Sequence, residues 1–317
     1  MIFESFIKNM YKSQLFSRQD DTNKAYYFSC DDFEGLNRTP YRFKSSKGHM
    51  LQGYFYSYEN PIENRIIVFD HGFGEGHRAY IKEIEMLCRK GYLVFSYDHT
   101  GCMESEGENC GGLSQSLVDL NNCLTTLKKD EKYKHCTFAV MGHSWGGYSS
   151  LNISRLHSDL SHVIVLAGPI SVKQMINYNF KGILSGYRSC IYELEKASNP
   201  QFIDYSAPTS LKNTNAKVLA IYSDNDPLVN KEMHYDELTK LPNITCVLSK
   251  NKGHNPNYTV NAVKLLTQYQ KELQRKVKKN ELETFAQKEE FIKSFDWNQM
   301  TEQDEEIWDM IYKHLEK

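Results

Sequence analysis

The first residue of this chain that could do chemistry is a serine with a glycine two positions before it and another two positions after it. Ser144 stands in the segment GHSWG, residues 142–146, directly after an apolar run at 136–141. When a buried strand leads into such a segment and a helix follows, the turn is so tight that its flanking positions must be small. The turn lifts the serine hydroxyl clear of the sheet edge, where it can attack an acyl carbon. Ser144 is therefore the predicted nucleophile.

A serine hydroxyl is a weak nucleophile until a base removes its proton, so Ser144 requires a histidine and a group that orients it. Among the histidines beyond the serine, His254 alone follows the last expected strand in a loop that leads into a helix, within the segment KGHNP. Gly253 gives the backbone the freedom to bring the imidazole toward the serine. We predict His254 as the general base and acid.

The acid that orients the histidine is expected after the preceding strand, where the segment SDNDPLV at 223–229 offers two aspartates. Asp226 is favoured, because the apolar residues behind it can pack down and hold its carboxylate inward. Asp224 would then be a turn residue that bonds local N–H groups. Both aspartates remain candidates at this stage.

The oxyanion formed by the attack needs two preorganised donors, which are usually backbone N–H groups. The N–H of Trp145, directly after the serine at a helix N-terminus, is the first predicted donor. The second is the N–H of Phe73, in the glycine-rich segment HGFGEG at residues 71–76. His71 and His143 are expected to support these loops through hydrogen bonds.

All these residues follow expected strands. After an antiparallel hairpin at 41–57, continuous apolar runs alternate with helical patterns. Strands are expected at 65–70, 92–97, 136–141, 162–167, 217–223 and 243–249, and helices at 79–90, 114–129 and from the serine to about 157. The alternation predicts an α/β fold whose central, mostly parallel sheet has helices on both faces and binds ligands at the carboxyl ends of its strands.

The chain divides into three expected parts. Residues 1–35 form an N-terminal helical segment, 36–275 the α/β domain and 276–317 a helical C-terminal extension. Within the domain, about 169–215 is too long for a crossover and is predicted to be a small helical cap over the site. Its apolar stripe, which includes Met175, Phe180 and Tyr187, is expected to line the substrate pocket. The alternative, that the stripe faces the body as ordinary core, stays open.

The extension at 276–317 is charged and free of glycine, and its apolar residues follow helical order. This pattern favours a helical hairpin that docks on the body or on a second copy of the chain over a disordered tail. A homo-oligomer formed through the extension is therefore one expectation.

Taken in order, the motifs resemble the monoglyceride lipase, lysophospholipase and esterase branch of the α/β-hydrolase superfamily, which shades into the S33-type serine aminopeptidases. The resemblance covers about residues 40–275 and rests on HGFGE at 71–75, YDHTG at 97–101, SEG at 105–107, GHSWGG at 142–147, DNDPLV at 224–229 and GH at 253–254. It implies the α/β-hydrolase fold, a triad of Ser144, Asp226 and His254, and oxyanion donors at Phe73 and Trp145.

The chain departs from the family pattern in three places. Met103 stands where the loop after Asp98 carries a second glycine in the family. The cap is shorter than in typical monoglyceride lipases. The extension beyond about residue 275 has no named counterpart.

The predicted function is a serine hydrolase that cleaves carboxylic esters with short or medium acyl groups, or monoacylglycerol-like esters, through an acyl-enzyme. Thioesters and peptides are alternatives, because fold and triad do not specify the acyl group. An aminopeptidase would need an acidic pocket for a free amine, which Glu193, Glu195 and Asp204 could form. From another class, the chain could be a ligand-binding module on a hydrolase scaffold. No cofactor and no metal are expected.

The composition argues against several other classes of protein. The net charge of −2 gives no reason to expect nucleic-acid binding, and no apolar window approaches the length of a membrane span. The eight cysteines lack C-x-x-C spacing, which favours reduced thiols and a cytoplasmic protein over a zinc site. The alternative to reduced thiols is a disulfide between Cys102 and Cys110, which lie in one loop.

Overall fold

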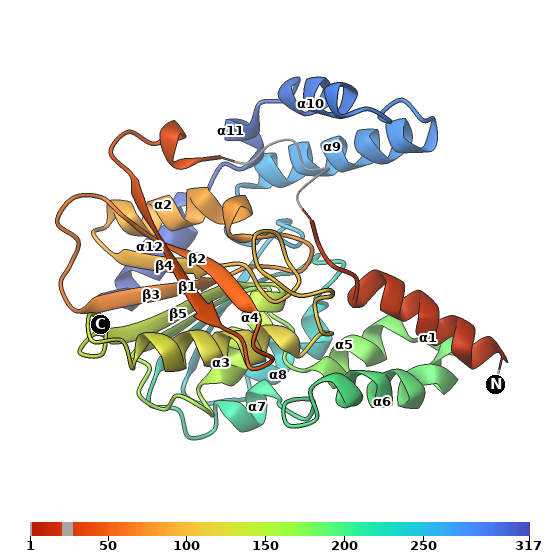
Figure 1. The fold of residues 1–317 in the computed structure, drawn as a ribbon, viewed down its shortest axis with the longest axis horizontal. Helices are drawn as coiled ribbons and strands as arrows, with labels where there is room; N and C mark the ends of the chain where they lie inside the picture. The colour runs from red at the N-terminus through yellow and green to blue at the C-terminus, as the bar shows by residue number, and fades with distance from the viewer. Residues whose placement is uncertain (1, 21–27) are drawn as a thin grey trace.

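The computed structural model describes residues 2–20 and 28–317, and through them runs one eight-stranded sheet (Figure 1). Its strands lie in the order β1-β2-β4-β3-β5-β6-β7-β8. β1 pairs with β2, and β2 with β4, in antiparallel fashion; the other neighbours are parallel. The strands are β1 (Asn37–Lys44), β2 (Met50–Ser57), β3 (Arg65–Asp70), β4 (Leu93–Tyr97), β5 (Thr137–His143), β6 (His162–Leu166), β7 (Lys217–Ser223) and β8 (Ile244–Ser249).

The inner strands are buried on both faces, which explains their continuous apolar sequences. Alternate residues of one strand enter two separate cores: Ile66 and Val68 of β3 face one core, whereas Ile67 and Phe69 face the other. The expected fold, a mostly parallel sheet with helices on both faces, is confirmed. The six strands from β3 to β8 begin and end within two residues of the expected limits.

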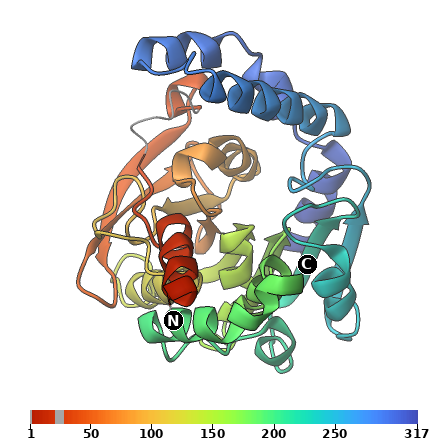
Figure 2. The same ribbon diagram turned by 90° about the vertical axis from the view of Figure 1, so that its right-hand side faces the viewer.

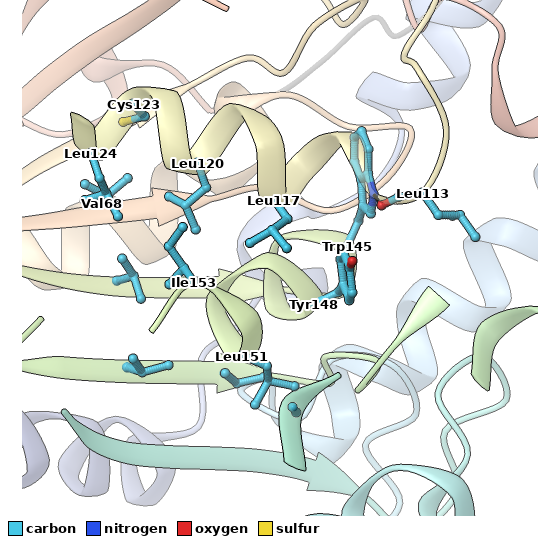
Figure 3. Packing of buried hydrophobic residues seen from close by; sticks show 14 of the residues in the cluster. Val68, Leu113, Leu117, Leu120, Cys123, Leu124, Trp145, Tyr148, Leu151 and Ile153 are labelled. Atoms are coloured by element: carbon cyan, nitrogen blue, oxygen red, sulfur yellow. Dashed lines mark hydrogen bonds between the residues drawn. The ribbon is translucent and has the colours of Figure 1, made fainter. Parts of the chain in front are cut away.

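Different helices cover the two faces of the sheet. α2 (Ile81–Arg89) and α12 (Glu305–Leu315) contribute to one core, and α3 (Gln115–Leu127) and α4 (Trp145–Ile153) to the other. Figure 3 shows the second core, in which leucines of α3 point toward α4 and the sheet. The labelled side chains include Leu117, Leu120, Leu124, Leu151 and Ile153, and all five are fully buried.

The N-terminal helix α1 (Ile2–Leu15) packs against the cap, defined here as residues 168–215. The cap contains α5 (Val172–Asn179), α6 (Arg188–Ser198) and α7 (Ala207–Ser210), and a short helix, α8 (Tyr235–Leu238), follows β7. Part of the N-terminal segment expected at 1–35 falls on residues 21–27 and lies outside the described residues.

The chain after β8 forms α9 (Val260–Lys278), α10 (Phe285–Lys293) and α11 (Trp297–Met300) before it returns to the sheet as α12. Figure 2 shows α9 and α10 on the side of the molecule opposite to α1 and the cap. Several apolar residues of the extension pack within the chain itself, whereas Phe285 is 59% exposed. Ile307, Trp308, Ile311 and Leu315 of α12 are buried against the sheet.

Two further findings concern the described residues. No helix among them has the length and apolar character needed to cross a bilayer. All eight cysteines lie in the described part of the chain and all are free thiols, Cys102 and Cys110 included.

Glu195 of α6 joins three segments around a buried carboxyl group. Its Oε1 accepts a hydrogen bond from the Tyr11 hydroxyl of α1 (2.6 Å), and its Oε2 accepts one from the Leu113 N–H, ahead of α3 (2.8 Å). Burial raises the pKa of Glu195 to about 7, although both hydrogen bonds act to lower it. The N-terminal helix, the cap and the body therefore meet at a group that titrates near neutral pH.

A carboxyl group with a raised pKa makes stability depend on pH. The contribution of Glu195 is fully present below the unfolded pKa of about 4.5 and is lost as pH rises through about 7. We expect the free energy of unfolding of the parent to fall by roughly 3 kcal/mol between pH 4.5 and 7.5 because of this group. In Glu195→Gln this fall should be absent. Urea unfolding at several pH values measures it. Glu193→Gln, on the exposed side of α6, is the control, and equal pH slopes for Glu195→Gln and the parent would contradict the assignment.

Candidate active site

Ser144 occupies a strained turn between β5 and α4. Its backbone angles, φ 54° and ψ −114°, lie in a region that residues other than glycine rarely adopt. A Cβ atom on Gly142 would lie 2.1 Å from the Gly146 carbonyl oxygen, and one on Gly146 would lie 2.0 Å from the Asp70 carbonyl oxygen. The two glycines therefore allow β3, β5 and α4 to meet backbone to backbone, and the turn leaves the Ser144 side chain partly exposed.

The loops after β7 and β8 bring His254 and Asp226 together. His254 Nδ1 lies 2.8 Å from Asp226 Oδ2, and the Asp226 side chain is fully buried. The other carboxylate oxygen, Oδ1, accepts hydrogen bonds from the N–H groups of Leu228 (2.8 Å) and Val229 (3.0 Å). The segment behind Asp226 thus fixes the carboxylate through two backbone donors, and the imidazole Nδ1–H donates to it.

Three consecutive short side chains connect the two loops. Ser223 Oγ accepts from Lys252 N (2.9 Å), Asp224 Oδ1 from Asn251 N (2.8 Å) and Asn225 Oδ1 from Gly253 N (2.8 Å). Gly253, the residue before His254, adopts φ 52°. Its position is therefore fixed by a hydrogen bond to the loop after β7. The roles of Ser223 and Asn225 were not predicted from the sequence. Their signal is a run of short side-chain acceptors directly at the end of a strand.

His143 links the turn before α4 to the histidine loop. Its Nε2 lies 2.8 Å from the His254 carbonyl oxygen, which can only accept, so Nε2 carries the proton. Burial lowers the pKa of His143 to about 3, and the nearby His254 adds to this shift. In the neutral ring, Nδ1 accepts from the Tyr80 hydroxyl (2.8 Å), whose oxygen in turn accepts from Gly72 N (3.0 Å).

His71, the first residue of the loop at 71–76, has a similar supporting role. Burial lowers its pKa to about 3, and its Nε2 accepts a hydrogen bond from the N–H of His99 (3.1 Å). Burial alone would also lower the pKa of His99, but the carboxylates of Asp70 (3.0 Å) and Asp119 (3.5 Å) outweigh it and raise the pKa to about 9. A buried imidazolium between two carboxylates therefore lies behind the site.

The two residues expected to supply oxyanion donors lie side by side. The ring of Phe73 meets the indole of Trp145 edge to face at 5.2 Å between centroids. Trp145 is buried, its indole N–H donates to the Leu113 carbonyl (2.6 Å), and its ring lies 4.7 Å from His99. These contacts fix the first residue of α4 and bring it next to the loop at 71–76.

The loop after β4 keeps a left-handed turn where the family pattern has its second glycine. Met103 adopts φ 43° there. Its N–H donates to the Gln19 carbonyl (2.7 Å), and its carbonyl accepts from the Arg18 guanidinium (2.7 Å). The N-terminal segment thus holds a conformation that methionine rarely adopts alone.

A cavity of about 710 Å³ opens at Ser144. This volume is in the range of small-molecule sites. Gly72, Phe73, His143, Ser144 and His254 line one part of it. The rest of the described lining includes residues of α9 and α11 and contains no lysine or arginine. No cluster of three or more histidine, cysteine or acidic side chains among the described residues could hold a metal ion.

The three cap residues expected at the substrate lie elsewhere. Phe180 is buried in the core with its ring 6.0 Å from that of Tyr11, and Tyr187 packs on Phe3 of α1 at 5.7 Å. Met175 packs against the same core. None of the three is among the described residues that line the cavity. These three side chains of the cap's apolar stripe face α1 and the body, which is the alternative that its helical spacing left open.

The parallel sheet, the turn at Ser144 and the paired loops after β7 and β8 define an α/β-hydrolase. The chain belongs to the S33 serine aminopeptidase family, whose sequence model matches residues 62–248. Monoglyceride lipases are among its relatives: that of Rattus norvegicus is 35% identical over 88 residues, 27% of this chain and 28% of the lipase. That of Mus musculus is 30% identical over 107 residues, 33% and 35% of the two chains. These matches span about a third of the lipases' length.

Solved structures of low identity share the fold. An esterase of Pyrococcus furiosus matches with a TM-score of 0.58 at 16% identity, over 80% of this chain and 96% of the esterase. Est1E of Butyrivibrio proteoclasticus, determined with ferulic acid bound, gives a TM-score of 0.57 at 16% identity, over 74% and 98% of the two chains.

The backbone contact at the serine turn predicts the effect of one added methyl group. Gly146→Ala places a Cβ against the Asp70 carbonyl, so we expect a loss of about 1–3 kcal/mol in the free energy of unfolding and a displaced Ser144. Chemical unfolding and labelling by a fluorophosphonate measure the two effects. Gly186→Ala is the matched control, because a Cβ there has no atom within 4 Å. Parent-like stability and labelling in Gly146→Ala would contradict this account of the turn.

Proposed function

We propose that the protein is a serine hydrolase that cleaves uncharged carboxylic esters through an acyl-enzyme. The observation that carries the proposal is the arrangement at one cavity: Ser144 on a strained turn, with His254 on the same lining and bonded to a buried Asp226. Membership of a serine hydrolase family and the similarity to monoglyceride lipases support it.

In the proposed reaction, His254 Nε2 takes the proton of the Ser144 hydroxyl while its oxygen attacks the ester carbonyl. Asp226 accepts the Nδ1–H hydrogen bond and stabilises the imidazolium. The N–H groups of Phe73 and Trp145 stabilise the oxyanion, at roughly 3–4 kcal/mol for each donor. Collapse expels the alkoxide, which takes the proton from His254. A water molecule, deprotonated by the same imidazole, then releases the carboxylic acid and regenerates the serine.

The contacts around the triad favour this cycle. His254 must keep one orientation through two proton transfers, and its loop is bonded both to the end of β7 and to His143. Because the pKa of His143 is lowered to about 3, this ring stays neutral and does not compete for the proton. The described lining contains no lysine or arginine and one acid, Glu75, which disfavours an anionic substrate.

The carboxylates suggested for an aminopeptidase do not meet at the cavity. Glu195 is buried beneath α1 and bonded to Tyr11, Asp204 accepts a hydrogen bond from Tyr192, and Glu193 is exposed on α6. None of these three acids is on the described cavity lining. Glu75 is the one acidic residue on the described lining, so the three-acid pocket suggested for a free amine is not formed there, and the ester reaction is preferred to the removal of an N-terminal residue.

Hydrolysis of p-nitrophenyl esters, from acetyl to palmitoyl, tests the proposal directly. We expect the parent to turn over the short and medium esters and Ser144→Ala to lose at least about 10⁴-fold in kcat, because nucleophilic catalysis is then absent. Fluorophosphonate labelling of the parent and not of the variant is the parallel measurement. Labelling without turnover across the series would instead favour the ligand-binding alternative.

The two neighbouring aspartates provide a matched test of the triad. Asp226→Asn keeps the shape of the residue but removes the charge that orients and stabilises His254, so we expect kcat to fall by about 10⁴-fold. Asp224→Asn keeps an oxygen that can accept from Asn251 N and should change kcat by less than about threefold. Equal losses in the two variants would contradict the choice of Asp226.

A further inference from the structure

Part of the cavity wall comes from the segment after His254. Val263, Leu266, Thr267 and Gln270 of α9 follow the spacing i, i+3, i+4 and i+7, and so share one face of the helix. Trp297 of α11 and Thr301 beyond it, four residues apart, complete this side. The match to the family model ends at residue 248, before all of these residues.

This wall is part of an excursion, residues 258–303, that leaves and rejoins the body at one point. Tyr258 and Gln303 form an antiparallel β-bridge. Thr259 N donates to the Glu302 carbonyl (2.9 Å), and Asp304 N donates to the Asn257 carbonyl (2.8 Å). The two chain segments at this neck are therefore paired by backbone hydrogen bonds on both sides of the bridge.

The neck is also tied to the body. The buried carboxylate of Glu83, in α2, accepts hydrogen bonds from the side-chain amides of both Asn257 and Gln303 (3.2 Å each). Lys252, close to the catalytic His254, forms an ion pair with Asp304. The position of the excursion is thus coupled to the histidine loop and to α2.

Within the excursion, a small apolar core holds α9, α10 and α11 together. Phe291 and Ile292 of α10 are buried with Leu282, and Tyr269 of α9 packs on them. The Trp297 indole N–H donates to the Ile292 carbonyl (2.8 Å), and its ring lies 5.1 Å from that of Tyr269. Trp297 is therefore held in place at the cavity before any ligand binds.

The wall changes character with distance from the catalytic histidine. A Cβ on Gly253 would lie 3.4 Å from Val263 Cγ1, so the Val263 end of α9 adjoins the histidine loop. Val263 and Leu266 are apolar, whereas Thr267 and Gln270 beyond them are polar. With a rise of about 1.5 Å per residue, the apolar stretch of α9 extends only about 5 Å before polar groups begin.

We propose that the excursion, and not the cap, selects the substrate, with Leu266 and Trp297 limiting the apolar group of the ester. The short apolar stretch followed by polar side chains fits esters with a short or medium chain better than long-chain lipids. The inference rests on the proposed ester hydrolysis and assigns the specificity of the same site.

The test compares two adjacent leucines of α9 that are both partly exposed, of which Leu266 lines the cavity and Leu265 does not. The readout is kcat/KM for p-nitrophenyl acetate, butyrate, octanoate and palmitate. We expect Leu266→Ala to raise the octanoate-to-acetate ratio by about tenfold, as expected for a change of one or more methylene groups in a pocket. Leu265→Ala should leave this ratio within about twofold of the parent.

Leu266→Trp is expected to have the opposite effect to Leu266→Ala. Its added volume at the wall should lower the octanoate-to-acetate ratio of kcat/KM by about tenfold. Circular dichroism and fluorophosphonate labelling like those of the parent show that each variant is folded and that its Ser144 is reactive. Parallel chain-length profiles for both Leu266 variants and the parent, with folding and labelling retained, would overturn the inference. Failure of the parent itself to turn over any ester would overturn the proposed function instead.

Discussion

Close backbone packing at the turn before α4 is the constraint on which the rest of the site depends. The left-handed conformation of Ser144 costs about 1–3 kcal/mol and persists only where the surroundings enforce it. Here they do so because Gly142 and Gly146 let the ends of β3 and β5 and the start of α4 come into contact. The same contact sets the loop at 71–76 beside Trp145. Nucleophile and oxyanion donors are thus proposed to share one rigid support.

Much of this arrangement could be predicted from the sequence, because each part has a local cause. Strands β3 to β8 are continuous apolar runs, since both faces of a parallel strand are buried. The residues proposed for catalysis follow strand ends, and the structure brings Asp226 and His254 to hydrogen-bond distance, with Ser144 and His254 on one cavity. The sheet and its order of elements were therefore predictable, as were the loops that bear the residues proposed for catalysis.

The elements that cover the cavity were not predictable in this way. Apolar residues at helical spacing indicate an amphipathic helix, but they do not reveal what its apolar face will contact. The stripe with Phe180 turned out to face α1 and the body. The expected division at residue 275 falls inside α9. Helices α9 and α12 are both amphipathic, and only tertiary packing distinguishes the helix at the cavity from the helix on the sheet.

The paired neck at Tyr258 and Gln303 has a consequence for how this fold can change. Since the chain leaves and re-enters the body at adjacent positions, the intervening residues behave topologically as one large loop, and α12 keeps its place on the sheet whatever their length. The entropy of closing a loop grows only slowly with its length. We therefore expect insertions and deletions in this segment to reshape the binding cavity without disturbing the order of the strands.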